Sequence, residues 1–254
     1  MAFRFGFPVV GVSPVPTFLT FSLCPMADEP SNASPLVLWG CSTSRTLRAH
    51  WALNELGLDY EHRPIGPRTG ETQTEEFTKL NPRQKIPLLQ DGDLVLAESA
   101  AIVNYLAEEY GQPDGLIPAA GTEARARYDQ WSFFVMMELD AHTLYVIRKH
   151  RDLAYLYGEA PAAIQTASEG FAKQSAVAEL EFADGREYLL GDRFTGVDIL
   201  LGSCLDWAVA YGEPIGERLA AYRERLNARP AYVRAAQANF FTRPELLPPS
   251  LRES

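Results

Sequence analysis

Between Asn81 and Leu106 the sequence reads NPRQKIPLLQDGDLVLAESAAIVNYL. Two apolar runs, 86–90 and 94–96, flank Asp91-Gly92, a pattern typical of a β-hairpin. Glu98-Ser99 then opens a helix in which apolar residues recur every three or four positions. The segment therefore predicts two antiparallel strands followed by an amphipathic helix.

Pro87 stands at the start of the first of these strands. A central strand normally excludes proline, because proline donates no hydrogen bond to the neighbouring strand. A cis Ile86-Pro87 bond at a ligand-binding edge would resolve this conflict, since cis bonds are essentially confined to proline and mark tight turns.

The residues before the hairpin add a strand–helix–strand unit. Leu36–Trp39 is a short apolar run closed by Gly40, and the hydroxyl-rich Cys41–Ser44 precedes a helical pattern that Gly57 ends. The segments that read as strand, helix, strand and short helix are 36–39, 44–56, 60–65 and 75–80. Because a strand–helix–strand crossover makes parallel strands and a hairpin makes antiparallel ones, residues 36–111 predict a small mixed sheet with helices, an α/β thioredoxin-like domain.

Helical patterns dominate the rest of the chain. Residues 112–121 hold prolines and glycines and predict a linker, and residues 122–242 predict an all-α domain followed by a tail, 243–254. The expected helices span 123–149, 161–183, 195–211, 217–228 and a short segment from 231. Thr195 and Asp198 form a capping-box pattern, a folding device without a catalytic role.

The first 34 residues differ from this pattern. They are apolar and aromatic but broken by prolines, and a polar spacer follows Met26. We expect a disordered extension, or sequence upstream of a start at Met26; a degenerate export signal is the alternative.

Composition excludes several classes of function. The 254 residues carry a formal net charge of -10, which argues against nucleic-acid partners, because these need a clustered basic face. No apolar run reaches the roughly 18 residues of a membrane-spanning helix. Three cysteines form no disulfide framework and favour a reducing, cytoplasmic location. The sequence shows no metal or nucleotide motif.

Five segments together resemble the cytosolic glutathione S-transferase family over about residues 36–240. They are Ser44–Trp51, Asn81–Pro87, Asp91–Leu94, Glu98–Leu106 and the capping segment Gly191–Asp198. The resemblance implies a thioredoxin-like domain followed by an all-α domain, a homodimer, glutathione as co-substrate without a metal, and transfer of the glutathione thiolate to a hydrophobic electrophile in detoxification.

The resemblance also implies a glutathione site. Glu98 and Ser99 match the pair that holds the γ-glutamyl end, where a carboxylate suits an ammonium and hydroxyl and N–H donors suit a carboxylate. The backbone of Ile86 matches the partner of the cysteinyl backbone, as an added strand would pair. Pro87 matches the family's cis-proline, and Lys85 a contact of the glycine carboxylate.

The catalytic hydroxyl is assigned to Thr43 or Ser44. Alignment of the first helix puts Thr43 at the active position of serine and cysteine classes, whereas Trp39 falls where tyrosine classes place their phenol. This favours a bacterial-type, serine/threonine-like member. A hydroxyl donated to the glutathione sulfur stabilises the thiolate and lowers the thiol pKa from about 8.5 toward neutrality. Both residues are also good helix caps.

The electrophile pocket is expected on the long helix 123–149. Phe134, Met137 and Tyr145 share one face with Glu138 and His142 at α-helical spacing, and part of this face would line the pocket. Such a face is also typical of core or dimer contacts. His142 is expected in the interior or at an interface.

Four further expectations concern single residues. Arg48 is expected on the helix surface and Trp51 in the core. Gln84 stands where many family members have glycine, so the turn before Lys85 is expected to differ. Cys41–Ser44 spells C-x-x-S, the spacing of monothiol redox proteins, so glutathione-dependent thiol transfer or disulfide reduction through Cys41 is an alternative.

A third hypothesis needs no turnover. In it, the chain binds glutathione or a partner protein as a non-catalytic module.

Overall fold

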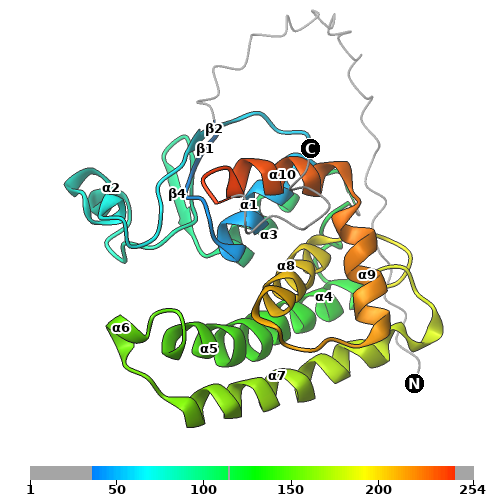
Figure 1. Cartoon of the computed structure of the whole chain (residues 1–254). Coiled ribbons are helices and arrows are strands. Elements are labelled where there is room, and N and C mark those ends of the chain that lie inside the picture. Colours follow the sequence, from blue (N-terminus) through cyan, green and yellow to red (C-terminus); the bar gives the residue numbers. More distant parts are fainter. Residues whose placement is uncertain (1–35, 114, 244–254) are drawn as a thin grey trace, which may run out of the picture. The chain divides into compact units, whose positions relative to one another are not determined.

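The computed structural model describes residues 36–113 and 115–243 (Figure 1). The expectations for residues 1–34 lie outside this part of the chain, and so does the predicted tail apart from Arg243.

A four-stranded sheet forms the centre of the N-terminal part. Its order is β2-β1-β3-β4, with β1 parallel to β2 and the other neighbours antiparallel. The strands are β1 (Leu36–Trp39), β2 (Tyr60–Arg63), β3 (Leu88–Asp91) and β4 (Leu94–Ala97). This confirms the thioredoxin-like mixed sheet. The Ile86-Pro87 bond is cis, as predicted, and it precedes β3 rather than lying within it.

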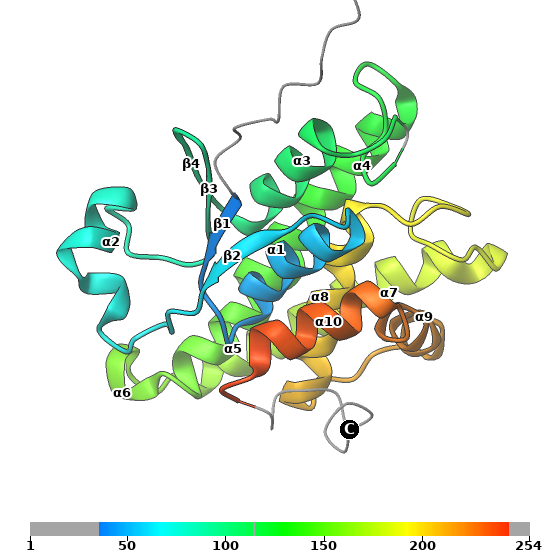
Figure 2. The same cartoon turned by 90° about the horizontal axis from the view of Figure 1, so that it is seen from above.

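Helices cover both faces of this sheet. Helices α1 (Ser44–Glu55) and α3 (Ser99–Glu109) lie on one side, and α2 (Glu75–Leu80) lies on the other (Figure 2). A short 3₁₀ turn, η1 (Glu71–Gln73), precedes α2. Phe77 of α2 stacks against Trp39 of β1 at 5.6 Å between ring centroids, which fixes α2 on its face.

The C-terminal part is helical. Its elements are α4 (Glu123–Phe134), η2 (Val135–Leu144), α5 (Tyr145–His150), α6 (Ala154–Tyr157), α7 (Pro161–Glu181), η3 (Phe182–Asp184), α8 (Gly196–Tyr211), α9 (Glu217–Asn227) and α10 (Pro230–Phe240). The Thr195–Asp198 capping box is present, with the Thr195 N–H donating to the Asp198 carboxylate at 2.7 Å. Asp198 is fully buried and also accepts from the Tyr222 hydroxyl.

The prediction of one α-helix over 123–149 is wrong in its middle. The segment η2 is a π-helix, and the Tyr145 N–H donates to the carbonyl of Asp140, five residues back. Because a π-helix turns less per residue than an α-helix, positions spaced three or four apart do not stay on one face. Of the predicted face, Met137 is 47% exposed. His142 is exposed within the chain, so of its two expected positions the interior one is wrong and the interface one stays a prediction.

One continuous hydrophobic core joins the sheet helices to the helical part. Trp51 of α1 is fully buried, as predicted, with its ring 4.8 Å from that of Tyr232 on α10. Gly202 of α8 faces the same indole, where an added Cβ would lie 3.2 Å from the Trp51 ring. This close approach lets α1 lie directly on α8.

Candidate active site

The loop that connects β1 to α1 begins with a close backbone approach. Gly40 has a φ of +117°, and a Cβ built there would lie 2.7 Å from the Cβ of Ile86. Only glycine combines this conformation with this lack of space. The loop before α1 and the residue before the cis-proline therefore lie against each other.

Thr43 is the N-cap of α1. Its hydroxyl accepts from the Thr46 N–H at 3.0 Å, and the Thr46 hydroxyl accepts from the Thr43 N–H at 3.1 Å, which completes a capping box. The Thr43 side chain is buried. Its hydroxyl is thus committed to the start of the helix.

Ser44 is the first residue of α1 and is half-buried. Its hydroxyl has no hydrogen-bond partner among residues 36–113 and 115–243 and lines a pocket. Its position at a helix N-terminus places it in the positive field of the helix dipole. Both predicted hydroxyls line the pocket, but only that of Ser44 has no hydrogen-bond partner among the described residues.

Helix α10 forms hydrogen bonds with the loop that connects β1 to α1. The carbonyl of Asn239 accepts from the Ser42 N–H at 2.8 Å, and its side-chain amide donates to the Thr43 carbonyl at 3.0 Å. The same side chain accepts from the Thr46 hydroxyl at 2.6 Å. Thr242 shares a hydrogen bond with the Ser42 hydroxyl at 2.8 Å. Ser42 has a φ of +62°, so these contacts stabilise a conformation that serine rarely adopts.

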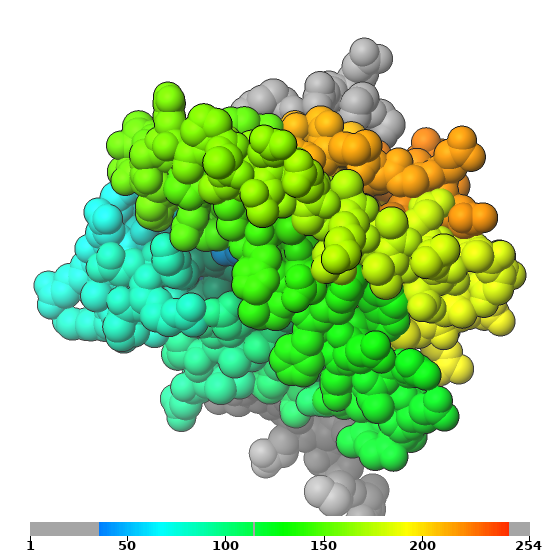
Figure 3. All heavy atoms as spheres, turned by 90° about the horizontal axis from the view of Figure 1, so that it is seen from below, coloured from blue at the N-terminus to red at the C-terminus, as the bar shows by residue number. Residues whose placement is uncertain are grey.

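The pocket beside Ser44 has a volume of about 280 Å³. It opens in a hollow between cyan atoms of the N-terminal part and green atoms of the helical part (Figure 3). Its lining comes from four places: the start of α1, the loop 66–74, the segment before the cis-proline, and helices α5, α6 and α8. The lining residues are Thr43, Ser44, Arg45, Pro67, Arg68, Thr72, Gln73, Arg83, Gln84, Lys85, Ile86, Tyr145, Arg148, Leu156, Tyr157 and Trp207.

Two of the predicted glutathione residues, Lys85 and Ile86, line this pocket. Pro87 is buried directly after them. Gln84 also lines the pocket and has a φ of +54°, a conformation that suits the glycine found there in many family members.

Glu98 and Ser99 lie outside the lining, at the N-terminus of α3. The Glu98 carboxylate is mostly exposed and pairs with Arg83 at 2.5 Å, and Arg83 is itself a pocket residue. Ser99 is buried, and its hydroxyl accepts from Arg48 at 3.2 Å.

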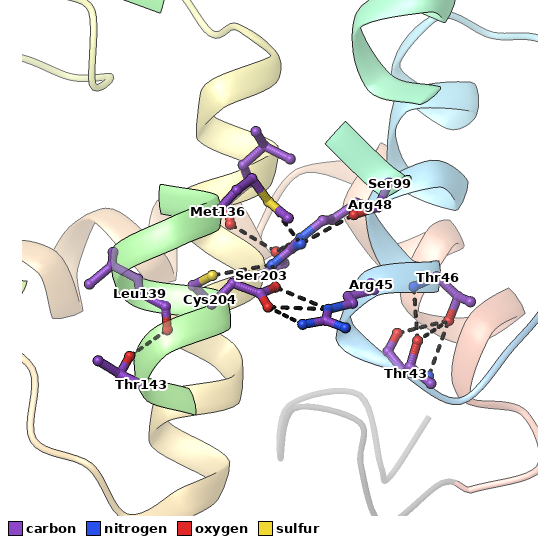
Figure 4. A network of polar contacts seen from close by, with 12 residues as sticks. Thr43, Arg45, Thr46, Arg48, Ser99, Met136, Leu139, Thr143, Ser203 and Cys204 are labelled. Carbon is purple, nitrogen blue, oxygen red and sulfur yellow. Dashed lines mark hydrogen bonds and ion pairs between the residues drawn. The ribbon is translucent and has the colours of Figure 1, made fainter. Parts of the chain in front are cut away.

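A buried ionic network lies beneath the pocket (Figure 4). Asp140 of η2 accepts from both Arg45 and Arg48, at 2.7 Å from the Nη2 atom of Arg48. Burial alone would raise the pKa of Asp140, but the two guanidinium groups hold it below its ordinary value. The expectation that Arg48 lies on the helix surface is wrong, because its side chain is fully buried against this carboxylate.

Arg48 connects this network to other elements. Its Nε donates to Ser203 of α8 at 2.6 Å, and Nη2 contacts the Cys204 sulfur at 3.2 Å. Burial raises the pKa of the Cys204 thiol to about 12, so this cysteine stays protonated and inert. With its contact to Ser99, Arg48 links α1, α3, α8 and η2. Sequence reasoning missed this role, although an aspartate within the apolar run 135–144 was a signal for it.

Cys41 is 2% exposed and does not line the pocket. Its thiol contacts the Pro64 carbonyl at 3.5 Å and accepts from the Ser42 hydroxyl at 3.5 Å. Of the three residues expected at the electrophile pocket, only Tyr145 lines it; Phe134 instead packs against Trp131 at 5.1 Å between ring centroids.

The described residues contain neither a membrane-spanning helix nor a metal-binding cluster. No helix among them is long and apolar enough to cross a membrane. Within the same ranges, no group of three His, Cys, Asp or Glu side chains is placed to hold a metal ion.

Known proteins share this architecture. Family models for the N-terminal and C-terminal domains of glutathione S-transferase match residues 34–108 and 161–228. Glutathione S-transferase 3 of Zea mays is 35% identical over 65% of this chain and 74% of its own length. A probable maleylacetoacetate isomerase of Vibrio cholerae is 33% identical over 80% of this chain and 96% of its own. The theta class glutathione S-transferase of Xanthomonas axonopodis pv. citri, solved with glutathione bound, is 31% identical and superposes with a TM-score of 0.66 over 80% of this chain and 97% of its own.

A thioredoxin-like sheet with a cis-proline edge, followed by a helical part that completes the pocket, defines a class of proteins with two structural parts. Within that class the sequence matches are decisive. The chain belongs to the glutathione S-transferase family.

Proposed function

We propose that this protein is a glutathione transferase of the serine/threonine-like type, with Ser44 as the residue that activates the thiol. One observation carries the proposal. A hydroxyl without a partner among the described residues stands at the N-terminus of α1, in the same pocket as Lys85 and Ile86. Thr43, the other candidate, caps the helix with its hydroxyl.

In the proposed binding mode glutathione extends from the pocket beside Ser44 to the N-terminus of α3, which lies outside the pocket lining. Glutathione pairs its cysteinyl backbone with that of Ile86 and its glycine carboxylate with Lys85. Its γ-glutamyl end lies at the N-terminus of α3, where Glu98 receives the ammonium and the buried Ser99 stands beside the carboxylate. Arg83 already contacts Glu98, so it closes this end of the site.

In the proposed reaction the Ser44 hydroxyl donates to the glutathione sulfur. This donation and the helix dipole favour the thiolate, whose proton passes to solvent. The sulfur lone pair attacks the electrophilic carbon, a carbon–sulfur bond forms, and the leaving group departs with its bonding electron pair. The electrophile lies toward Tyr145, Leu156 and Trp207, which supply the apolar part of the helical wall.

The experiment measures glutathione affinity by calorimetry and conjugation of chlorodinitrobenzene for the parent and single variants. We expect Ser44→Ala to lower kcat by about 10²-fold and to raise the thiol pKa of bound glutathione. Glu98→Ala should weaken glutathione binding, and Cys41→Ser should change neither property. Full activity in Ser44→Ala would contradict the assignment.

Two alternatives give different results in the same experiment. Thiol transfer through Cys41 is disfavoured because that thiol is buried away from the pocket; it predicts loss of activity only in Cys41→Ser. A non-catalytic module predicts tight glutathione binding without any turnover.

A second candidate function comes from the Vibrio cholerae relative, which aligns over 96% of its length. In an isomerase, the same thiolate would add to a conjugated double bond, allow rotation about the resulting single bond and then leave. Such a reaction consumes no glutathione, so free glutathione after complete isomerisation of a cis-alkene substrate distinguishes it from conjugation.

We propose three further properties of the whole protein. The glutathione domain spans 36–111, the linker 112–121 and the helical domain 122–242. The protein acts in detoxification in the cytoplasm. It also forms a homodimer through α3 and the long helical segment that begins with α4. Phe133 of α4 is 71% exposed and would lie in this interface. Equilibrium sedimentation of the parent and Phe133→Glu tests the dimer.

A further inference from the structure

The pocket beside Ser44 is lined by cations although the protein is acidic. The whole chain carries a net charge of -10, yet the lining holds five basic side chains and no acidic one. These basic residues are Arg45, Arg68, Arg83, Lys85 and Arg148. A concave site with one sign of charge attracts ligands of the opposite sign.

Two of these cations are already neutralised. Arg45 pairs with the buried Asp140, and Arg83 pairs with Glu98. Arg68, Lys85 and Arg148 have no ion pair with a carboxylate in the described part of the chain. The proposed function assigns Lys85 to the glycine carboxylate of glutathione. Arg68 and Arg148 therefore remain without an anion.

Arg68 and Arg148 both line the part of the pocket to which helices α5 and α6 contribute. Arg148 lies on α5, and Arg68 lies in the loop 66–74, close enough to Tyr157 of α6 to lower the pKa of its hydroxyl. Burial lowers the pKa of Arg148, and the charge of Arg68 lowers it further. Besides Arg68, the charges of Lys85 and Lys149 also lower the pKa of Tyr157. The carboxylate of Asp152 acts in the opposite direction on Arg148, but the net shift is still downward, so the positive field at this wall is not fully balanced.

We infer that the electrophile carries a carboxylate and that Arg148 and Arg68 receive it while its reactive carbon faces Ser44. The inference rests on the proposed transferase function and narrows its second substrate to anionic, partly aromatic electrophiles. An arginine binds a carboxylate with two parallel hydrogen bonds, which orients the ligand as well as attracting it. The nearby Tyr145 and Trp207 rings supply the apolar surface for the rest of the molecule.

The first experiment compares two product analogues by calorimetry, so it does not depend on turnover. S-benzylglutathione and S-(carboxybenzyl)glutathione differ only in the carboxylate. The parent should bind the carboxylated adduct about tenfold more tightly, and Arg148→Gln should abolish this preference. Arg148→Lys should retain part of it, which separates the loss of charge from a loss of fold.

The second experiment measures kcat/KM with chlorodinitrobenzene and with chloronitrobenzoate. Each variant is judged by the ratio of these two values relative to the parent, because the two compounds differ in intrinsic reactivity. We expect Arg148→Gln and Arg68→Gln to lower the ratio about tenfold and to leave the KM for glutathione unchanged. Arg225→Gln is the matched control, since Arg225 is an exposed arginine of α9 that lies outside the lining.

The results distinguish a carboxylate on the electrophile from the glycine carboxylate of glutathione. If the arginine variants weaken both adducts equally or raise the KM for glutathione, these residues bind the glycine carboxylate and the inference is wrong. If the parent binds S-benzylglutathione but shows no preference for the carboxylated adduct, the inference is also wrong while the transferase function stands. If the parent binds neither adduct, the glutathione site itself is wrong and the inference fails with it.

Discussion

Arg48 and Asp140 form an ion pair in which neither side chain is exposed to solvent, with 2.7 Å between Nη2 and Oδ2. The pair joins α1, which begins at Ser44, to the π-helix of the second part of the chain. Arg45, from the same helix, shares the carboxylate and lines the pocket with its other face.

We expect Asp140→Asn to lower the free energy of unfolding by about 3–5 kcal/mol, because it leaves two guanidinium groups partly or fully buried without a counter-charge. Urea denaturation measures the change. The control is Asp129→Asn, which breaks an exposed pair with Arg125 on α4 and should cost less than about 1 kcal/mol. Equal effects of the two substitutions would show that the network contributes little.

Asn239→Ala should lower both stability and activity. It removes the acceptor of the Thr46 hydroxyl and the donor to the Thr43 carbonyl, all three groups being buried, at a cost of about 1–3 kcal/mol. Because the loop before Ser44 loses its support, kcat should fall while the KM for the electrophile stays near that of the parent. Gln237→Ala, at an exposed position of α10, serves as the control. A fall in stability with kcat unchanged would limit Asn239 to a structural role.

Substitutions at Thr43 and at Ser44 should have different effects on the free energy of unfolding. Thr43→Ala removes the N-cap of α1 and should lower the free energy of unfolding by about 0.5–2 kcal/mol, whereas Thr43→Ser keeps the capping oxygen and should restore most of it. Ser44→Ala breaks no hydrogen bond within the described residues and should leave stability unchanged within about 0.5 kcal/mol. The reverse order of effects would exchange the two roles.

His50 should make the fold sensitive to acid. It lies between the Tyr60 hydroxyl, at 2.7 Å, and the Gly40 carbonyl, and burial together with the charge of His62 lowers its pKa to about 3. Since the ordinary value is 6.5, the unfolded chain binds one more proton here between pH 6.5 and 3. Stability from this residue is complete above pH 6.5 and falls with pH through that window, by up to about 1.4 kcal/mol per unit.

Unfolding of the parent and His50→Gln between pH 4 and 7 tests this, since only the difference between the two curves reports on His50. The exposed His142→Gln is the control. Parallel curves for parent and His50→Gln would mean that the histidine titrates normally.

The two described cysteines should be unreactive in the native state. Cys41 and Cys204 are 2% and 0% exposed. In a Cys24→Ser background, an aromatic disulfide reagent should label neither until the protein unfolds. Rapid labelling of Cys41 under native conditions, lost in Cys41→Ser, would revive the thiol-transfer alternative.

The parts of the fold that sequence reasoning recovered are those coded locally. The hairpin around Asp91-Gly92, the cis bond before Pro87 and the Thr195–Asp198 capping box each depend on residues a few positions apart. The same holds for Lys85 and Ile86, which adjoin the proline and therefore reach the pocket together.

The parts that it missed depend on distant contacts. Asn239 and Thr43 are 196 positions apart, and no local pattern marks one as the partner of the other. Sequence reasoning does not predict the π-helix, because it interprets the apolar spacing in 123–149 with the period of an α-helix. Arg48 was placed at the surface because a charged residue on a helix usually lies there, and only its buried carboxylate partner overrides that tendency.

The support that Asn239 gives to the loop before Ser44 has a consequence for biosynthesis. A ribosome makes Ser42, Thr43 and Thr46 early, and the groups that complete their hydrogen bonds arrive almost two hundred residues later. Until Asn239 is made, the loop before Ser44 lacks the hydrogen bonds that Asn239 forms with Ser42, Thr43 and Thr46. The proposed role of Ser44 therefore requires translation through residue 239, because a chain that ends earlier lacks the hydrogen bonds from Asn239 to this loop.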